Sequence, residues 1–273
     1  MRLPSLIGVI HLQPLPGSPG AFGEKANLCL ERSGALAVQE AKVLEKAGFD
    51  GLILENFCDV PFYKDRVPPE TIAAMSVIAA AVRETSKLPI GINILRNDAR
   101  AAHAVAAVTG CNFIRVNVLS GIAATDQGMV EGEAAFLLRE RNRFFSQIGI
   151  FADVHVKHAK TLSSDDVVLG VEEVAQRAMA DAVILTGATT GRSVDMTELE
   201  NASRAARENR IPLYVGSGTN IDNLQLIRPL VHGVIVGSAI RKGGVAGRRL
   251  DSNRIKNFIK VFRKLSSKKN RKN

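Results

Sequence analysis

The sequence predicts an α/β protein that folds as a single closed (β/α)8 TIM barrel. Eight short apolar runs alternate with amphipathic helical stretches, and the length of 273 residues is typical of such a barrel. No stretch rich in Pro, Gly or Ser divides the chain into separate parts. Because the runs are apolar and no hairpin turn is evident between them, a closed parallel barrel fits better than an open doubly wound sheet.

Each expected strand is an apolar run bounded by charged or turn-forming residues. In chain order the strands span residues 6–10, 51–55, 90–94, 113–118, 150–156, 182–186, 213–216 and 234–237. Apolar residues at intervals of three and four predict a helix after each strand, and Gly48 and Gly110 stand where the first and third helices are expected to end. The helices span residues 36–47, 69–82, 98–108, 131–145, 165–179, 196–208, 221–230 and 252–265.

The fifth expected strand carries three reactive side chains at alternating positions. Because side chains alternate between the two faces of a strand, Asp153, His155 and Lys157 share one face, with Lys157 nearest the barrel mouth and Asp153 deepest. Burying an acid, an imidazole and an amine together is costly unless they pair, bind a metal or meet a ligand. We therefore expect these three residues and Glu55, at the end of the second strand, to be catalytic.

The same residues allow other assignments. Asp153 and His155 are candidate ligands of a divalent metal, the one cofactor the sequence suggests, with His11 and Glu55 completing the coordination. A buried polar network that ties the interior layers of the barrel together is the alternative. For Lys157 the alternatives are a phosphate contact, a Schiff-base amine or an ion-pair partner.

Polar residues also stand at the ends of the other strands, where active sites of TIM barrels lie. The residues expected to bind substrate are His11, Asn56, Asn93, Arg96, Arg115, Asn117 and Thr186.

Two glycine-containing turns follow the seventh and eighth strands. Glycine lets backbone N–H groups approach an anion, and the N-terminus of the next helix adds a favourable dipole. We expect these turns to bind phosphate, whereas ordinary tight strand-to-helix turns are the alternative. The residues are Gly216, Ser217 and Gly218 in the first turn, and Gly237 and Ser238 in the second.

The net charge of +9 comes from the end of the chain. Nine Lys and Arg residues follow Asn253 with no acid among them, so the rest of the chain is neutral. We expect a barrel domain over residues 1–265 and a disordered basic tail over residues 266–273. The tail is either a solvated end or, together with the basic residues of 241–244, a peripheral contact with an anionic membrane. Nucleic acid is not expected as a partner, because the body is neutral, Trp is absent and there are only two Tyr.

The three cysteines indicate a reducing compartment. Cys29, Cys58 and Cys111 are isolated and lack metal-ligand spacing, so we expect reduced thiols in a cytoplasmic protein. We expect neither a secretory signal nor a membrane span, since no run approaches the roughly 18 apolar residues that a span needs. The sequence leaves a homo-oligomer open.

Several long motifs resemble the BtpA family, also called the BtpA/SgcQ family. They are residues 8–19, 55–62, 93–98 and 151–158, together with residues 115–118 and 125–132. The resemblance implies a TIM barrel of the ribulose-phosphate-binding type. One member of that family is associated with photosystem I biogenesis at the thylakoid membrane, whereas others look like sugar-metabolism proteins.

Two functions from different classes follow. The first is an enzyme that acts on a phosphorylated sugar or nucleoside-like small molecule by acid/base or metal-assisted chemistry. Its reaction would be that of a phosphosugar isomerase, epimerase or aldolase, or of a nucleosidase-like enzyme. The alternative is a photosystem I biogenesis or stability factor that docks peripherally on a membrane through its rim or basic tail.

Overall fold

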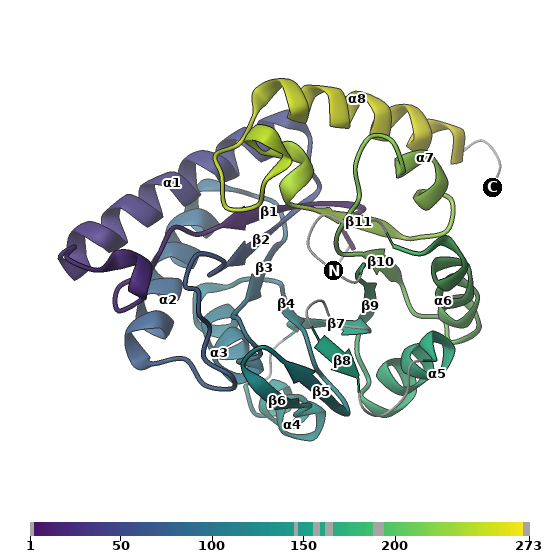
Figure 1. Ribbon diagram of the computed structural model, residues 1–273, viewed down its shortest axis with the longest axis horizontal. Helices are drawn as coiled ribbons and strands as arrows, with labels where there is room; N and C mark the ends of the chain where they lie inside the picture. Colours follow the sequence, from purple (N-terminus) through teal and green to yellow (C-terminus); the bar gives the residue numbers. More distant parts are fainter. Residues whose placement is uncertain (1–2, 145–146, 155–158, 162–165, 188–193, 270–273) are drawn as a thin grey trace.

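A closed barrel of eight parallel strands forms the body of the protein. The computed structural model describes residues 3–144, 147–154, 159–161, 166–187 and 194–269. Neighbouring strands follow the order β1-β11-β10-β9-β7-β4-β3-β2 (Figure 1). All eight expected barrel strands are present: β1 Leu6–His11, β2 Gly51–Glu55, β3 Ile90–Asn93, β4 Phe113–Val116, β7 Gly149–Val154, β9 Ala182–Leu185, β10 Leu213–Val215 and β11 Gly233–Val236.

Helices surround the barrel (Figure 1). Gly48 and Gly110 end the first and third helices with left-handed backbone, as expected. The helices are α1 Ala26–Ala47, α2 Pro69–Thr85, α3 Ala99–Thr109, α4 Ala134–Arg143, α5 Val167–Glu172 with a π-helical continuation over Glu173–Arg177, α6 Met196–Glu208, α7 Leu224–Ile227 and α8 Ser252–Lys269.

The boundaries of α1 and α8 differ from the prediction. The α1 helix begins at Ala26 instead of residue 36. Its buried face extends toward the N-terminus from Ala37 through Ser33 to Cys29. The polar Ser33 and the neighbouring Gly34 interrupt the apolar pattern in the sequence, which hid this first part of the helix. The α8 helix continues to Lys269, so residues 266–269 are helical, and residues 270–273 of the expected tail lie outside the described residues.

Aromatic side chains fill the N-terminal half of the barrel interior. The Phe113 and Phe151 rings stack at 4.5 Å, and Phe151 lies 5.2 Å from Tyr214, whose hydroxyl donates to the carbonyl of Pro4 at 2.8 Å. Gly91 makes room for this layer, since a Cβ there would lie 2.3 Å from the Phe113 ring. The next inward-facing residues on β4 and β7 are polar, so the aromatic layer is a floor beneath a polar layer.

A small three-stranded antiparallel sheet, which the sequence analysis missed, lies at the C-terminal end of the barrel. Its order is β6-β5-β8, built from Ile122–Thr125 (β5), Gly128–Glu131 (β6) and Ala159–Thr161 (β8) (Figure 1). The expected absence of hairpins was therefore wrong, and the helix expected over residues 131–145 spans only Ala134–Arg143. The hairpin turn depends on the Thr125 hydroxyl, which donates to the Gly128 carbonyl at 2.8 Å. Gly128 itself has a φ of 105°.

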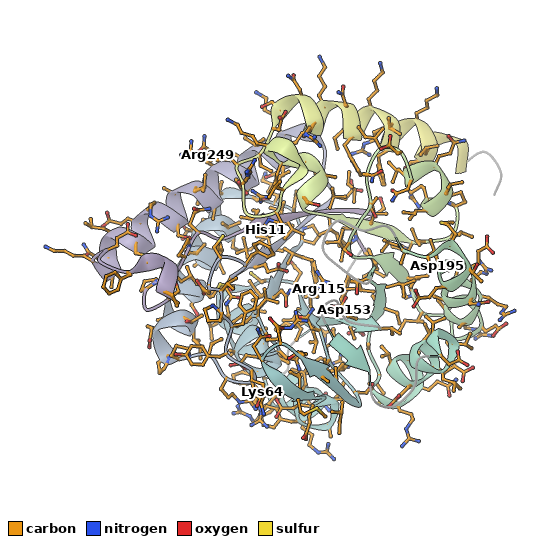
Figure 2. The ribbon with its side chains drawn as sticks, viewed as in Figure 1. His11, Lys64, Arg115, Asp153, Asp195 and Arg249 are labelled. Atoms are coloured by element: carbon orange, nitrogen blue, oxygen red, sulfur yellow. The ribbon has the colours of Figure 1, made fainter. Side chains whose placement is uncertain are left out.

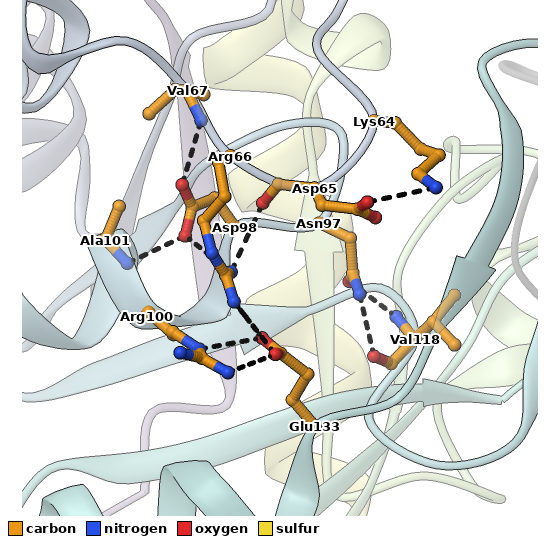
Figure 3. A network of polar contacts seen from close by, with 10 residues as sticks. All are labelled: Lys64, Asp65, Arg66, Val67, Asn97, Asp98, Arg100, Ala101, Val118 and Glu133. Atoms are coloured by element: carbon orange, nitrogen blue, oxygen red, sulfur yellow. Dashed lines mark hydrogen bonds and ion pairs between the residues drawn. The ribbon is translucent and has the colours of Figure 1, made fainter.

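A network of ion pairs fastens the loops on this side of the barrel (Figure 3). Asp98 caps α3 by accepting from the backbone of Ala101 at 2.9 Å, and it also accepts from the Val67 backbone at 2.9 Å. Glu133, which follows β6, pairs with Arg66 and with Arg100. The loop after β2, the start of α3 and the end of the hairpin are thereby held together.

A buried ion pair joins the end of the barrel to its beginning. The Arg241 guanidinium, which follows β11, binds both carboxylate oxygens of Glu40 on α1 at 2.8 and 2.9 Å, and it donates to the Val9 carbonyl at 2.9 Å. Arg241 is only 1% exposed, so it cannot contribute to a membrane contact, contrary to the expectation for residues 241–244. None of the helices in the described part of the chain is long and apolar enough to span a bilayer.

Candidate active site

An ion pair between neighbouring strands forms the centre of the candidate site (Figure 2). Arg115 on β4 contacts both carboxylate oxygens of Asp153 on β7, at 3.1 to 3.2 Å, and both side chains are buried. Asn117, just after β4, donates to Asp153 Oδ2 at 2.6 Å. The alternation predicted for the fifth strand is confirmed where the structure describes it, since Asp153 faces inward and Ala152 and Val154 pack toward the helices.

A second carboxylate approaches the same guanidinium. Glu55 at the end of β2 accepts from Asn93 Nδ2 at 2.7 Å and lies 3.9 Å from Arg115 Nη1. Burial lowers the pKa of Arg115, but the charges of Asp153 and Glu55 outweigh this effect and raise its pKa overall. Arg115 is therefore a permanent cation at the bottom of the site, placed between two carboxylates.

The contacts of Asp153 bear on the catalytic and metal-binding roles expected for it. Its carboxylate is occupied by a guanidinium and an amide, an arrangement that stabilises the anion and disfavours a second cation beside it. Within the described residues no group of three or more His, Cys, Asp or Glu side chains is placed to hold a metal ion. His155 and Lys157, the other residues predicted on this strand, lie outside the described residues.

His11 at the end of β1 faces the glycine turn after β11. Its Nδ1 accepts from the backbone N–H of Gly247 at 3.1 Å, and its ring lies 4.4 Å from that of Phe57. A Cβ at Gly237 would lie 3.1 to 3.2 Å from the imidazole Cε1 and Nε2 atoms. Glycine at 237 thus leaves the space that the His11 ring occupies.

The turn after β10 presents a hydroxyl that has no hydrogen-bond partner among the described residues. Thr219 Oγ1 is buried and forms no hydrogen bond, and the backbone N–H groups of Gly218 and Thr219 donate to no acceptor in the described part of the chain. Gly216 is required for close packing, since a Cβ there would lie 2.5 Å from Ile184 Cγ2. Thr219 was not predicted, although its position directly after the Gly216–Gly218 turn was the available sequence signal.

One cavity brings the cation and the two turns together. Its volume is about 40 Å³, and it lies at the C-terminal end of the barrel strands. Of the predicted residues it joins His11, Glu55, Arg115, Gly216, Ser217, Gly218, Gly237 and Ser238, and its other lining residues are Val9, Phe57, Thr219, Ile235 and Ala246.

Five predicted substrate-binding residues do not line this cavity. Asn93 and Asn117 donate to Glu55 and Asp153, and the other three are Asn56, Arg96 and Thr186. Asn56 joins the loops that follow β2 and β3: it accepts from the Leu95 backbone at 2.8 Å and donates to Asp59, whose carboxyl pKa is raised by burial. Arg96 is buried after β3, which lowers its pKa. Thr186 directly follows β9, with its methyl group 2.9 Å from the position of a Cβ on Gly216.

The helix dipoles expected at the two turns are largely missing. The helix α7 has only four residues, and the element after β11 is a 3-10 helix of three residues, Ser238–Ile240. A helix this short has a small macrodipole. An anion at the turns would therefore depend on individual N–H and hydroxyl groups and on nearby cations.

Comparison with known proteins identifies relatives over almost the whole chain. A family model described as the BtpA family matches residues 2–264. An uncharacterized protein of Methanocaldococcus jannaschii is 44% identical over 260 residues, which cover 95% of each chain. The photosystem I biogenesis protein BtpA of Synechocystis sp. is 42% identical over 257 residues, covering 94% of this chain and 87% of that protein.

Solved structures show the same architecture. N-(5'-phosphoribosyl)anthranilate isomerase from Pyrococcus furiosus superimposes with a TM-score of 0.55 at 15% identity, covering 95% of this chain and 99% of that one. At this level of identity the likeness concerns the fold, and it confirms the predicted TIM barrel.

Proposed function

This chain belongs to the BtpA family, and from that premise we propose that it is an enzyme acting on a phosphorylated sugar or nucleoside-like small molecule. The observation that carries the proposal is a cavity that Glu55, Arg115 and the two glycine turns line together. A site of this composition can hold a phosphoryl group at one end and act on a neighbouring carbon or oxygen at the other.

The turn side of the cavity suits a phosphoryl group. A buried water molecule needs roughly 10–15 Å³ of cavity volume. A cavity of about 40 Å³ therefore has room for about three oxygen atoms of a phosphoryl group. The unpartnered Thr219 hydroxyl and the N–H groups of Gly218 and Thr219 are donors that gain hydrogen bonds when an anion arrives. The positive charge of Arg115, which also lines the cavity, increases its affinity for anionic ligands.

Glu55 and Arg115 provide groups for proton transfer and charge stabilisation. Glu55 is the candidate general base or acid, because only one protein donor, Asn93, contacts it within hydrogen-bonding distance among the described residues. Arg115 would stabilise negative charge that develops on a substrate oxygen. Asp153 and Asn117 are positioning residues that hold the guanidinium in place. We therefore favour acid/base chemistry, of the kind that isomerases and epimerases use, over metal-assisted chemistry.

A photosystem I biogenesis factor is the second candidate, and the name of the Synechocystis relative supports it. The similarly close relative from Methanocaldococcus jannaschii is not named for such a role, so support for it comes from the name of one relative. The outward Lys256, Lys260 and Arg263 of α8 are the residues that such a factor would offer to an anionic membrane.

Ligand-induced thermal stabilisation tests the phosphate site. A panel of sugar phosphates and nucleotides, with and without Mg²⁺, should contain a compound that raises the melting temperature of the wild type, since a ligand at 100 times its Kd stabilises by about 2.7 kcal/mol. Thr219→Val should keep the melting temperature of the free protein, because no protein bond is lost, yet reduce the ligand-induced rise. Ser203→Ala is the matched control: Ser203 is buried in α6, away from the cavity, and its hydroxyl donates to the Leu230 carbonyl at 2.6 Å. That control should lower the melting temperature but keep the ligand-induced rise.

A turnover assay with the stabilising compound then tests the acid/base role. Glu55→Gln should retain ligand binding and reduce turnover by about 10²- to 10⁴-fold. The proposal fails if no phosphorylated compound stabilises the wild type, or if Glu55→Gln turns over at the wild-type rate. Binding of the wild type to anionic vesicles, lost on replacing Lys256 and Lys260 by Gln, would instead support the membrane-associated factor.

A further inference from the structure

A rigid loop separates the candidate active site from a second concave surface. The loop, residues 241–250, is anchored by the buried Arg241–Glu40 pair, and its two ends are joined by the Lys242 N–H, which donates to the Arg249 carbonyl at 3.0 Å. Its inner side faces the active-site cavity through Ala246. Its outer side, together with α1, encloses a groove.

The groove has the size of a ligand site. Its volume is about 520 Å³, within the roughly 300–1,000 Å³ that is typical of small-molecule pockets. It shares no lining residue with the active-site cavity, although Ala246 lines one and Gly247 the other. The residues around the groove are Gln13, Arg32, Ala35, Leu36, Gln39, Lys242, Gly247, Arg248 and Arg249.

The lining is strongly and one-sidedly charged. Four cations and two amides face the groove, and no carboxylate lines it. Arg32 is paired with Glu24 at 2.8 Å, whereas Lys242, Arg248 and Arg249 form no ion pair with the described part of the chain. Figure 2 shows Arg249 on the outer side of the loop and His11 on the inner side. The cations around this groove repel one another, and a bound anion would relieve that repulsion.

We propose that this groove is a second anion site, which binds a small organic phosphate with at least two negative charges. Guanidinium groups bind phosphoryl oxygens in pairs, and the ammonium of Lys242 and the amide of Gln39 supply further donors. A concave groove of this volume encloses a free ligand better than it fits the flat surface of a lipid bilayer. The proposal does not depend on turnover at the active-site cavity.

Pyrophosphate is the probe, and calorimetric titration of the full chain at constant ionic strength is the measurement. The variant Lys242→Gln/Arg249→Gln should weaken pyrophosphate binding roughly tenfold or more, since it removes two charged donors. The matched control, Lys256→Gln/Lys260→Gln, removes the same charge from the outer face of α8 and should change the affinity less than twofold. Equal weakening in both variants, or no weakening in the groove variant, would overturn the proposal.

Two further measurements locate the ligand. The side-chain amide of Gln39 lines the groove and not the active-site cavity, so its NMR resonance should shift when pyrophosphate binds to the wild type and to Thr219→Val alike. A shift that Thr219→Val abolishes would place the probe in the active-site cavity and overturn the groove assignment. Vesicles of phosphatidylglycerol and phosphatidylcholine at a ratio of 1:3 test whether the groove binds lipid headgroups instead of a free phosphate compound. Vesicle binding that the groove variant abolishes, without any pyrophosphate binding, would likewise overturn the assignment.

Discussion

Gly247 donates its backbone N–H to Nδ1 of His11 at 3.1 Å, across 236 positions of the sequence. An accepting nitrogen carries no proton, so the proton of the neutral imidazole is on Nε2, which faces the Gly237 turn. We predict that long-range ¹H–¹⁵N spectra of His11 at neutral pH show the Nε2–H tautomer. A protonated Nδ1 in the neutral ring would contradict this geometry.

The buried Arg115–Asp153 pair predicts a large, non-additive effect on stability. Asp153→Leu leaves a buried guanidinium with Glu55 at 3.9 Å as its remaining carboxylate, and should lower the free energy of unfolding by about 3–5 kcal/mol. Arg115→Met combined with Asp153→Leu should cost less than the sum of the single changes, with a coupling of about 0.5–3 kcal/mol. Urea unfolding of the four proteins in this cycle gives the coupling, and strict additivity would show that the pair is not coupled.

Two glycines predict opposite effects of the same substitution. Gly34 lies inside α1 with only Ile78 Cγ1 near a Cβ, at 3.7 Å, so Gly34→Ala should stabilise the protein by about 0.5–1 kcal/mol. At Gly216 the Cβ would lie 2.5 Å from Ile184 and 2.9 Å from Thr186, so Gly216→Ala should destabilise by about 1–3 kcal/mol. Thermal unfolding of both variants checks the sign of each effect.

The buried imidazole of His103 predicts a loss of stability in mild acid. Burial in α3 lowers its pKa, so the unfolded chain takes up a proton near the ordinary value of about 6.5 while the folded protein does not. Stability from this group is fully present above that pH and falls as the pH decreases toward the folded-state pKa. Urea unfolding at pH 7.5 and 5.5 should show a smaller pH dependence for His103→Gln than for the wild type. If His103→Gln and the wild type showed the same pH dependence of stability, groups other than His103 would be responsible for it.

The barrel could be predicted from the sequence because period-two and period-3.6 patterns directly report burial. The small sheet could not, since its strands are short and its turn depends on Thr125 and Gly128 instead of an Asn-Gly or Asp-Gly pair. The start of α1 was missed because the buried face of its first turns includes Ser33.

The candidate site was predicted as a set of residues, but not as a set of contacts. Alternation placed Asp153 inside the barrel, yet its pairing with Arg115 depends on the register of β4 against β7, where Arg115 is opposite Phe151. A hydropathy pattern assigns charged residues to the surface, so it could not predict that Arg241 and Glu40 are buried as an ion pair. Partners distant in sequence are fixed only when the barrel closes.

The stacked rings of Phe113 and Phe151 close the barrel at the end opposite to the candidate site. A ligand in the cavity above them therefore has no route through the barrel axis. In the enzyme that we propose, substrate would enter and product would leave through the same opening, and because both would occupy the same cavity they would exclude each other. Product inhibition of such an enzyme would be competitive, and any loop over that opening would control both entry and release.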